Sequence, residues 1–358
     1  MSSKQVGFSL IIVSAIVIFP ETVVRLALLP PGSFPVNPKE DPLYVADPIR
    51  GYTLNPGAHS DYTTPDIDVE IDINSDGIRD APLTEARKAR YRVLAVGDSF
   101  TMGLGVAQQD TWSEQLERLM QSSEPSRAAA VVNGGVPGYS PRQIRQRLEE
   151  LLPRAQPHLV VFGLVTETFV RMFRPLQLFG GTLVRSDAIP RMQLVRGGIL
   201  YSPFEQAWMR EADFWLNQHW QFSAHILARL YRAANGQEVS DWERIGLDPD
   251  AVRRQMEPTF AELTRSRQLA THAGATFLVL LINLQDQGDT FRPRQAVYNR
   301  VVLDYCKAEG VRCVDPLPRL EQEAHGRPVF RTASDQHWTP AAHAIAAEVL
   351  LRAIDLAP

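Results

Sequence analysis

Five short, mostly apolar runs stand out along the chain from residue 91 onward. They have the pattern of parallel strands that are buried on both faces. They are YRVLAVG at 91–97, AAAVVNGG at 128–135, HLVVFGL at 158–164, ATFLVLLIN at 275–283 and VRCVD at 311–315. Segments with helical character lie between and after them, at 111–120, 141–152, 249–273, 295–308 and 339–354. This alternation predicts an α/β domain over 91–358, with a doubly wound, mostly parallel five-stranded sheet.

Two regions do not follow the alternation. Residues 30–90 are rich in Pro, Asp and Gly, and the stretch DVEIDINSDGIRD suits a strand, so we expect a linker and a small β-rich cap. Residues 170–247 are expected to be an insertion, with two short helices between 204 and 234. The insertion holds four of the six Trp residues, Trp208, Trp215, Trp220 and Trp242. These rings either stack on sugars or pack the insertion's own helices onto the sheet.

The N-terminus carries an uncharged apolar run, VGFSLIIVSAIVIF, at 6–19. No small-x-small cleavage site follows it, which favours an uncleaved signal anchor, a transmembrane helix over 1–29, rather than a removed signal peptide. Lys4 orients such an anchor with its N-terminus inside. We therefore expect a single-pass protein of the inner membrane whose α/β domain is periplasmic. The alternative is a buried N-terminal helix.

Composition and charge narrow the function. The chain has 358 residues, and its formal net charge of -4, without a long basic run, argues against a nucleic-acid partner. It has no Walker loop and no GxGxxG fingerprint, which argues against a nucleotide-binding class. Cys306 and Cys313 are too few for a structural zinc site, so we expect no metal. An exported chain would allow them to form a disulfide, a pairing that their spacing alone leaves open.

The first candidate for chemistry is Ser99, in the run Gly97-Asp98-Ser99-Phe100-Thr101 directly after the first buried strand. A serine at the carboxyl end of a strand is exposed above the sheet, where its hydroxyl attacks and its own N–H faces an oxyanion. The alternative, without a catalytic role, is that Asp98 and Ser99 only form a turn of the chain.

The second candidate is the pair Asp335 and His337, in the run DQHW just before the last predicted helix. Histidine is the usual base for a serine nucleophile, and a carboxylate fixes its tautomer. The alternative, without a catalytic role, is that His337 is a loop histidine in contact with solvent. His343, within the helix that follows, is taken as structural.

Two further loops follow predicted strands, NGGVPGYS at 133–140 and GLVTE at 163–167. Glycine allows a close approach of the backbone to a ligand. The carboxyl ends of parallel strands meet at one edge of a sheet, so all four elements can converge there. Such convergence is more specific than any one motif.

The chain resembles the SGNH/GDSL hydrolase superfamily over residues 91–351. The resemblance rests on four motifs in the family's order: GDSFT, NGGVPG, the third-strand loop and a C-terminal Asp–His pair. The resemblance implies a flavodoxin-like sheet and esterase, lipase or acyl-transfer chemistry. It implies Ser99 as nucleophile, His337 as base and Asp335 as its partner. The N–H groups of Ser99 and Gly138 would be oxyanion donors. NSDGIRD and FVRMFRP are similar to membrane-anchored members found with bacterial surface-polysaccharide genes.

The chain departs from that family pattern at two places. The third oxyanion donor, an Asn side chain in the family, reads Thr166 here, followed by Glu167. A threonine hydroxyl donates with a shorter reach, and one missing donor typically costs about 2.7–4 kcal/mol of barrier. The family spacing Asp-x-x-His is Asp-x-His here, since Ser334 stands three before His337. The string Asp-x-His-Trp-Thr is similar to that of alginate O-acetylation proteins.

These observations predict a cofactor-free serine acyl ester hydrolase or O-acyltransferase. We expect it to act on acyl groups, such as acetyl, of cell-surface polysaccharide or on a small ester. Its expected partners are the membrane and exopolysaccharide-assembly proteins. A different class stays open, a non-catalytic glycan-binding or scaffold protein on the same fold, because Thr166 and the aromatic insertion both allow it.

Overall fold

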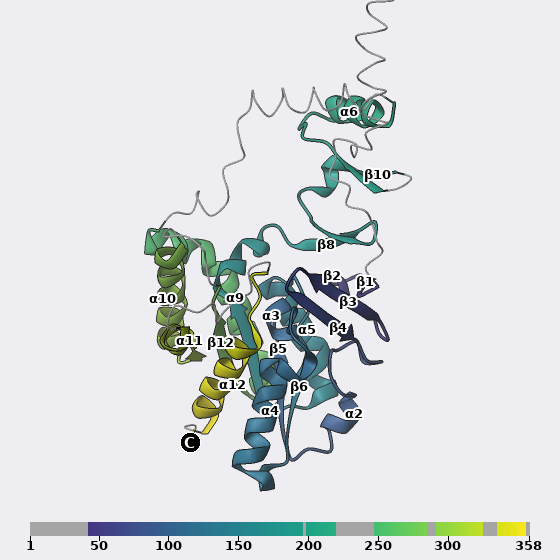
Figure 1. Ribbon diagram of the computed structural model, residues 1–358. Helices are drawn as coiled ribbons and strands as arrows, with labels where there is room; N and C mark the ends of the chain where they lie inside the picture. The colour runs from purple at the N-terminus through teal and green to yellow at the C-terminus, as the bar shows by residue number, and fades with distance from the viewer. Residues whose placement is uncertain (1–41, 196–197, 220–246, 285–290, 325–334, 356–358) are drawn as a thin grey trace, which may run out of the picture. The chain divides into compact units, whose positions relative to one another are not determined.

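The computed structural model describes residues 42–195, 198–219, 247–284, 291–324 and 335–355 (Figure 1). The chain divides into a larger compact unit, Pro42–Leu178 with Asp241–Pro358, and a smaller one, Met1–Asp41 with Phe179–Ser240. The expected anchor at 1–29 lies outside the described residues. None of the helices in the described part is long and apolar enough to cross a membrane.

Five parallel strands form the sheet of the larger unit, in the spatial order β6, β5, β7, β12 and β13. In chain order they are β5 (Tyr91–Val96), β6 (Ala129–Asn133), β7 (Leu159–Val165), β12 (Thr276–Ile282) and β13 (Arg312–Val314). The spatial order is therefore 2-1-3-4-5, that of flavodoxin-like sheets. The predicted five-stranded parallel sheet is confirmed, and each strand lies close to the range expected from the sequence.

Two pairs of helices cover the two faces of this sheet (Figure 1). On one face, α4 (Trp112–Ser123) and α12 (Pro340–Asp355) share an apolar cluster with β5, β7 and β12. On the other face, α5 (Pro141–Ala155) and α9 (Pro249–His272) pack against β5 and β12. The remaining helical elements of the larger unit are α2 (Leu83–Ala86), α3 (Ser99–Met102), α10 (Phe291–Glu309), α11 (Leu317–Ala324), η1 (Gln108–Asp110), η2 (Pro125–Arg127) and η3 (Thr166–Met172).

The segment expected to be a β-rich cap forms two antiparallel hairpins within the larger unit. The strands are β1 (Tyr44–Asp47) with β2 (Gly51–Leu54), and β3 (His59–Thr64) with β4 (Ile67–Asp72). Arg79, which is 1% exposed, joins the second hairpin to the α/β domain. Its guanidinium donates to the carbonyl of Glu70 at 3.2 Å and to those of Gly103 and Val106 at 2.6 and 2.9 Å. The described part of the cap is therefore fixed to the loop that follows α3.

Side chains cover the open edge of β6, the outermost strand on its side of the sheet. The Val131 N–H donates to Glu117 at 2.8 Å, and the Asn133 N–H donates to Asp80 at 2.6 Å. Gln121 donates to the Ala129 carbonyl at 3.0 Å. These backbone groups are thus paired with side chains in place of a neighbouring strand.

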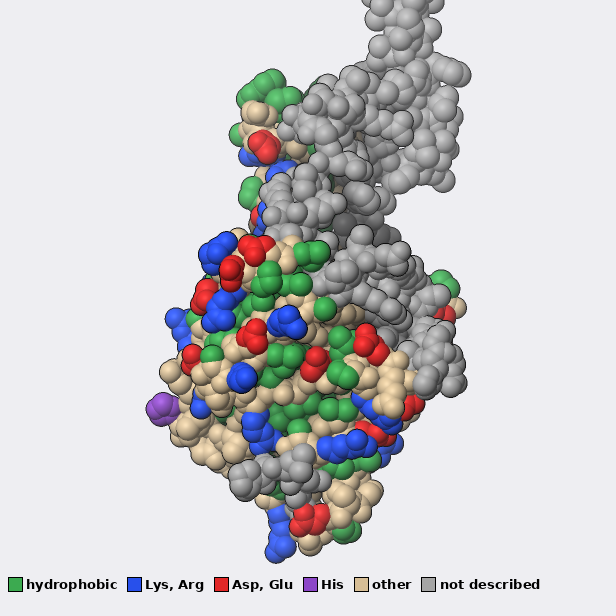
Figure 2. Space-filling view, turned by 90° about the vertical axis from the view of Figure 1, so that its left-hand side faces the viewer, with side chains coloured by type: hydrophobic (Ala, Val, Ile, Leu, Met, Phe, Trp, Pro, Cys, Tyr) green, Lys and Arg blue, Asp and Glu red, His purple; other side chains and the backbone are tan. Residues whose placement is uncertain are grey.

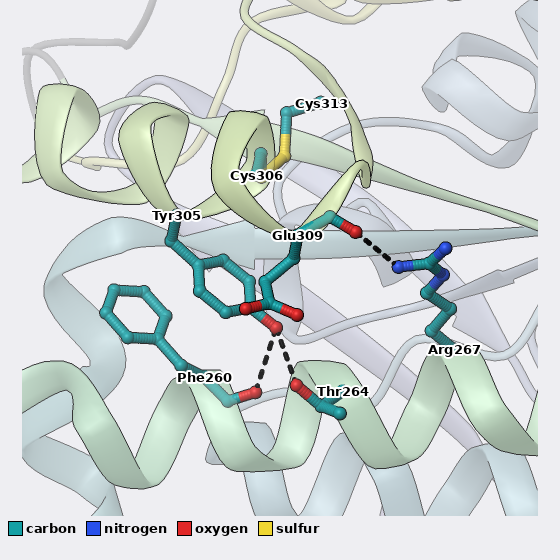
Figure 3. The surroundings of a disulfide bond; sticks show 7 residues. All are labelled: Phe260, Thr264, Arg267, Tyr305, Cys306, Glu309 and Cys313. Carbon is teal, nitrogen blue, oxygen red and sulfur yellow. Dashed lines mark hydrogen bonds between the residues drawn. A yellow bond between two sulfur atoms is a disulfide. The ribbon is translucent and has the colours of Figure 1, made fainter.

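Cys306 of α10 and Cys313 of β13 form a disulfide, with their Cα atoms 6.1 Å apart (Figure 3). The turn between them ends α10 at Gly310, which has a positive φ of 62°. The neighbouring Tyr305 ring stacks on Phe260 of α9 with centroids 4.3 Å apart. The disulfide that the sequence left open is therefore present, in a part of the fold where α9, α10 and β13 meet.

The inserted segment contains two hairpins and one helix in its described part. Of the two helices expected between 204 and 234, one is present, and residues 220–234 lie outside the described residues. Its elements are β8 (Leu176–Phe179) with β9 (Thr182–Arg185), η4 (Ile189–Arg191), β10 (Met192–Val195) with β11 (Gly198–Tyr201), and one helix, α6 (Ala207–His219). Trp208 and Trp215 on α6 are 72% and 53% exposed, so these two rings do not fill a core. Trp220 and Trp242 lie outside the described residues.

Charged side chains of both signs are interspersed over the face of the molecule in Figure 2. Pairs one helical turn apart include Arg319 with Glu323 on α11 at 2.7 Å, and Arg253 with Glu257 on α9 at 3.9 Å. Exposed pairs of this kind contribute little stability, typically about 0–1 kcal/mol. They keep a charged surface locally balanced.

Candidate active site

Ser99 lies where the central strand β5 ends and the short helix α3 begins. A Cβ at Gly97 would lie 2.0 Å from the Thr101 hydroxyl oxygen, so this turn requires glycine. Asp98 caps α3, because its carboxylate accepts the N–H of Phe100 at 3.1 Å. Ser99 is therefore presented at the carboxyl edge of the sheet, beside the point where the strand order reverses.

His337 and Asp335 come from the loop directly before α12. The His337 Nε2 lies 2.8 Å from the Ser99 Oγ, and its Nδ1 lies 2.6 Å from Asp335 Oδ1. Asp335 Oδ1 also accepts the backbone N–H of His337 at 2.8 Å, so the short Asp-x-His spacing still brings the two groups together. Ser334 lies outside the described residues. The expectation that Ser99 and His337, 238 positions apart, lie within hydrogen-bond reach is confirmed.

The Asp335 carboxylate is held in its ionised form. Burial by itself would raise its pKa, but the hydrogen bond and positive charge of His337, together with the Tyr62 hydroxyl, hold the pKa of Asp335 well below its usual range. An ionised Asp335 accepts the Nδ1 proton and leaves Nε2 of His337 free to accept the Ser99 proton.

Tyr62 is a residue of the site that the sequence did not single out. Its hydroxyl donates to Asp335 Oδ2 at 2.5 Å from strand β3. The half-buried side chains of β3 alternate with exposed ones, and Tyr62 shares a face with Ser60 and Thr64. This alternation is in the burial of the side chains and not in the residue types of HSDYTT, so the sequence carried no signal for Tyr62 or for its partner 273 positions away.

The second backbone donor, Gly138, lies in the loop after β6 with a φ of +78°, a conformation that favours glycine. A Cβ there would lie 2.6 Å from Leu176 and 2.8 Å from the Tyr52 hydroxyl oxygen. That hydroxyl donates to the Pro137 carbonyl at 2.7 Å, which fixes the loop. The N–H groups of Ser99 and Gly138 donate to no acceptor in the described part of the chain. They are therefore available to a ligand oxygen, and their oxyanion role stays a prediction.

The Thr166 hydroxyl, expected as a third donor to the oxyanion, contacts other side chains of the protein. Its hydroxyl lies 3.1 Å from the Glu167 carboxylate and 3.1 Å from the side-chain oxygen of Asn299 in α10. Both are acceptors, and a hydroxyl has one proton. In this arrangement the Thr166 proton is used inside the protein, so the available donors are the two backbone N–H groups.

A cation lies beside the turn that carries the nucleophile. The Arg171 Nη1 is 3.4 Å from Asp98 Oδ2. Burial raises the pKa of Asp98, and the positive charges of Arg171 and His337 act in the opposite direction. Within the described ranges, no group of three or more His, Cys, Asp or Glu side chains is placed to hold a metal ion.

His343 is buried in the larger unit, as its structural interpretation required. Its Nδ1 accepts the N–H of Trp112 at 3.1 Å and so joins α12 to α4. Burial, with the nearby charges of His337 and Arg79, lowers the pKa of His343 to about 3. The ring is neutral at neutral pH and takes no part in the contacts of Ser99.

Ser99, His337 and Asp335 have the order and contacts of a Ser–His–Asp triad, the class of site that serves acyl transfer on several unrelated folds.

The chain is similar to solved structures of GDSL-type hydrolases. One is TesA, at 16% identity over 74% of this chain and 97% of that chain, with a TM-score of 0.41. Another is an acetylxylan esterase from Geobacillus stearothermophilus, at 15% identity over 75% and 96%, with a TM-score of 0.42.

A third is a lipolytic protein of the G-D-S-L family from Desulfitobacterium hafniense, at 13% identity over 73% of this chain and 98% of that chain, with a TM-score of 0.40. No protein-family model matches the chain, and no curated protein matches it. With similarity this low, the function has to be inferred from the residues of the site.

Proposed function

We propose that this protein is a serine-dependent acyl ester hydrolase or O-acyltransferase. The observation that carries the proposal is the unbroken hydrogen-bonded series from Ser99 through His337 to Asp335. Residues from two ends of the domain meet at one edge of the sheet, with the histidine oriented by an ionised carboxylate. This is the arrangement that turns a weak hydroxyl into a nucleophile.

In the proposed reaction, His337 Nε2 takes the Ser99 proton as the oxygen attacks the acyl carbon of an ester. The N–H groups of Ser99 and Gly138 stabilise the oxyanion of the tetrahedral intermediate. The intermediate collapses to an acyl-serine, and the alcohol leaves with the proton from His337. Water then attacks the acyl-serine to give hydrolysis, or a sugar hydroxyl attacks it to give transfer.

For the substrate, we propose an acyl group, such as acetyl, on cell-surface polysaccharide. The support is the resemblance of NSDGIRD and FVRMFRP to membrane-anchored proteins of that kind. The Cys306–Cys313 disulfide supports a domain outside the cytoplasm, because disulfides persist in oxidising compartments. The anchor over 1–29, the inner-membrane location and exopolysaccharide-assembly partners belong to the same proposal.

The exposed Trp208 and Trp215 favour a second candidate, glycan binding without catalysis. They lie seven positions apart on α6 and so project from nearby faces of that helix. Flat aromatic faces offer apolar area to a sugar ring. Turnover of an ester distinguishes the two candidates, because a glycan-binding protein without catalysis would not hydrolyse it.

The test is hydrolysis of an aryl acetate by the full chain in detergent. Ser99→Ala and His337→Ala should each lower kcat by about 10³-fold or more, and the double variant should be no worse, because triad members act as a unit. His272→Ala, at an exposed position on α9, is the matched control. Thermal unfolding should be unchanged in all variants. Full activity in Ser99→Ala would reject Ser99 as the nucleophile, whereas absence of turnover in the wild-type protein would favour glycan binding.

A further inference from the structure

Two different donors hold the two oxygens of the Asp335 carboxylate. Oδ1 accepts the backbone N–H of His337 and faces its Nδ1, at 2.8 and 2.6 Å. Oδ2 accepts the hydroxyl of Tyr62 at 2.5 Å, from a strand that lies 273 positions earlier in the chain. The phenol thus acts on the side of the carboxylate that His337 does not reach.

The surroundings of Oδ2 make this contact hard to replace. Asp335 is 8% exposed, so little solvent reaches its carboxylate. Gly105 is close, since a Cβ on it would lie 3.6 Å from Oδ2, but this neighbour brings no side-chain donor. Among the described residues, Tyr62 is the one side chain other than His337 that donates to Asp335.

The strand that carries Tyr62 is itself fixed to the site. β3 pairs with β4 over its whole length. The buried Arg79 guanidinium links the Glu70 carbonyl of β4 to the carbonyls of Gly103 and Val106 in the loop after α3. The Tyr62 hydroxyl is therefore delivered from a framework that also holds the loop behind the nucleophile.

We propose that Tyr62 is a positioning residue for the triad, whose hydroxyl fixes the Asp335 carboxylate and thereby the His337 ring. The inference rests on the proposed acyl-transfer function for its effect on rate. Its effect on the hydrogen bond between His337 and Asp335 does not depend on turnover. Tyr62 touches no reacting atom, so it orients the base through another residue.

Without the phenol, the negative charge of Asp335 is no longer shared with a donor at Oδ2. More of that charge then faces His337 from Oδ1, and the carboxylate is freer to rotate. The first effect strengthens the pull on the Nδ1 proton, and the second misaligns the ring. The misalignment outweighs the stronger pull in its effect on the rate, so we expect a slower chemical step, with substrate binding unchanged.

Tyr62→Phe tests the proposal, because it removes only the hydroxyl. Ser60→Ala, on the same face of β3, is the matched control. In the full chain, we expect Tyr62→Phe to lower kcat for an aryl acetate about tenfold, the effect of one hydrogen bond to a charged group, with KM unchanged. The NMR resonance of the His337 Nδ1 proton should move downfield in Tyr62→Phe and stay in place in Ser60→Ala.

An unmoved Nδ1 resonance in Tyr62→Phe overturns the proposal, whatever happens to the rate. A fall in kcat with an unmoved resonance would mean that Tyr62 only stabilises the fold. The same spectrum decides the matter if the wild-type protein shows no esterase turnover. In that case a shifted resonance still supports positioning by Tyr62, and it is the acyl-transfer function that fails.

Discussion

The Thr166 hydroxyl has two acceptors within reach and one proton to share between them. Glu167 and Asn299 both lie 3.1 Å from it, and Thr166 itself is 1% exposed. A buried acceptor that loses its donor carries the cost of having left water. The Thr166 hydroxyl therefore contributes to the stability of the fold, separately from any role in catalysis.

We expect Thr166→Val to lower the free energy of unfolding by about 1–3 kcal/mol, because it leaves buried oxygens without their donor. Turnover per folded molecule should not change, since the hydroxyl donates inside the protein. Denaturant unfolding and aryl acetate hydrolysis measure the two quantities. Thr166→Ser keeps a hydroxyl and is the control. A tenfold or larger loss of kcat in the Val variant, without a loss of stability, would restore the oxyanion role.

Asp80 is the residue of the β6 edge whose ionisation matters most for stability. Burial raises its pKa to about 7, although the Asn133 N–H that it accepts acts against this rise, and the negative charge of Glu114 adds to it. The ordinary value is 3.8. The folded protein therefore holds a proton on Asp80 that the unfolded chain has already released between these two values.

From this shift we expect the Asp80 contribution to stability to be fully present below about pH 4 and lost as the pH rises to about 7. Asp80→Asn keeps an oxygen for the Asn133 N–H and does not titrate. The variant should gain stability relative to wild type between pH 5 and pH 8, as measured by denaturant unfolding at both. A constant difference between the two proteins over that interval would show that Asp80 is ionised in the folded state throughout.

At the scale of elements, apolar runs were predictable and short mixed strands were not. β7 and β12 are almost wholly apolar and buried, so few structures besides an interior strand suit their sequences. β9 reads TLVR and β10 reads MQLV, four residues each, too short to show a period. These short strands were therefore not predicted, whereas α6 lies within the range 204–234 where helices were expected.

The site divides in the same way. Ser99, Asp335 and His337 were predictable because each stands at the end of a recognisable element and has a characteristic chemistry. Tyr62 was not, because its role depends on a contact between the cap and the loop before α12. The engagement of Thr166 was not predictable either, since it needs Asn299 of α10 beside it. Tertiary neighbours decide what a polar side chain does.

At the scale of the whole molecule, the disulfide and the apolar N-terminus lead to one joint prediction. If the α/β domain is exported, a reporter fused after Pro358 should be active outside the cytoplasm and remain with membranes. Protein isolated from that compartment, denatured without reductant, should show no free thiol, because Cys306 and Cys313 are joined. A soluble cytoplasmic reporter together with two titratable thiols would reject the anchor and the export.

The two edge strands of the central sheet limit how this protein can bind an extended polypeptide. At β6, Glu117 and Asp80 already occupy the N–H groups that an added strand would need. At the opposite margin, β13 is three residues long and is tied covalently to α10 through Cys313. Neither margin offers a free ladder for β-augmentation or for amyloid-like stacking of one copy on the next. A linear polymer that associates with the described margins of the central sheet is therefore bound by side chains, as a glycan is, and not by backbone pairing.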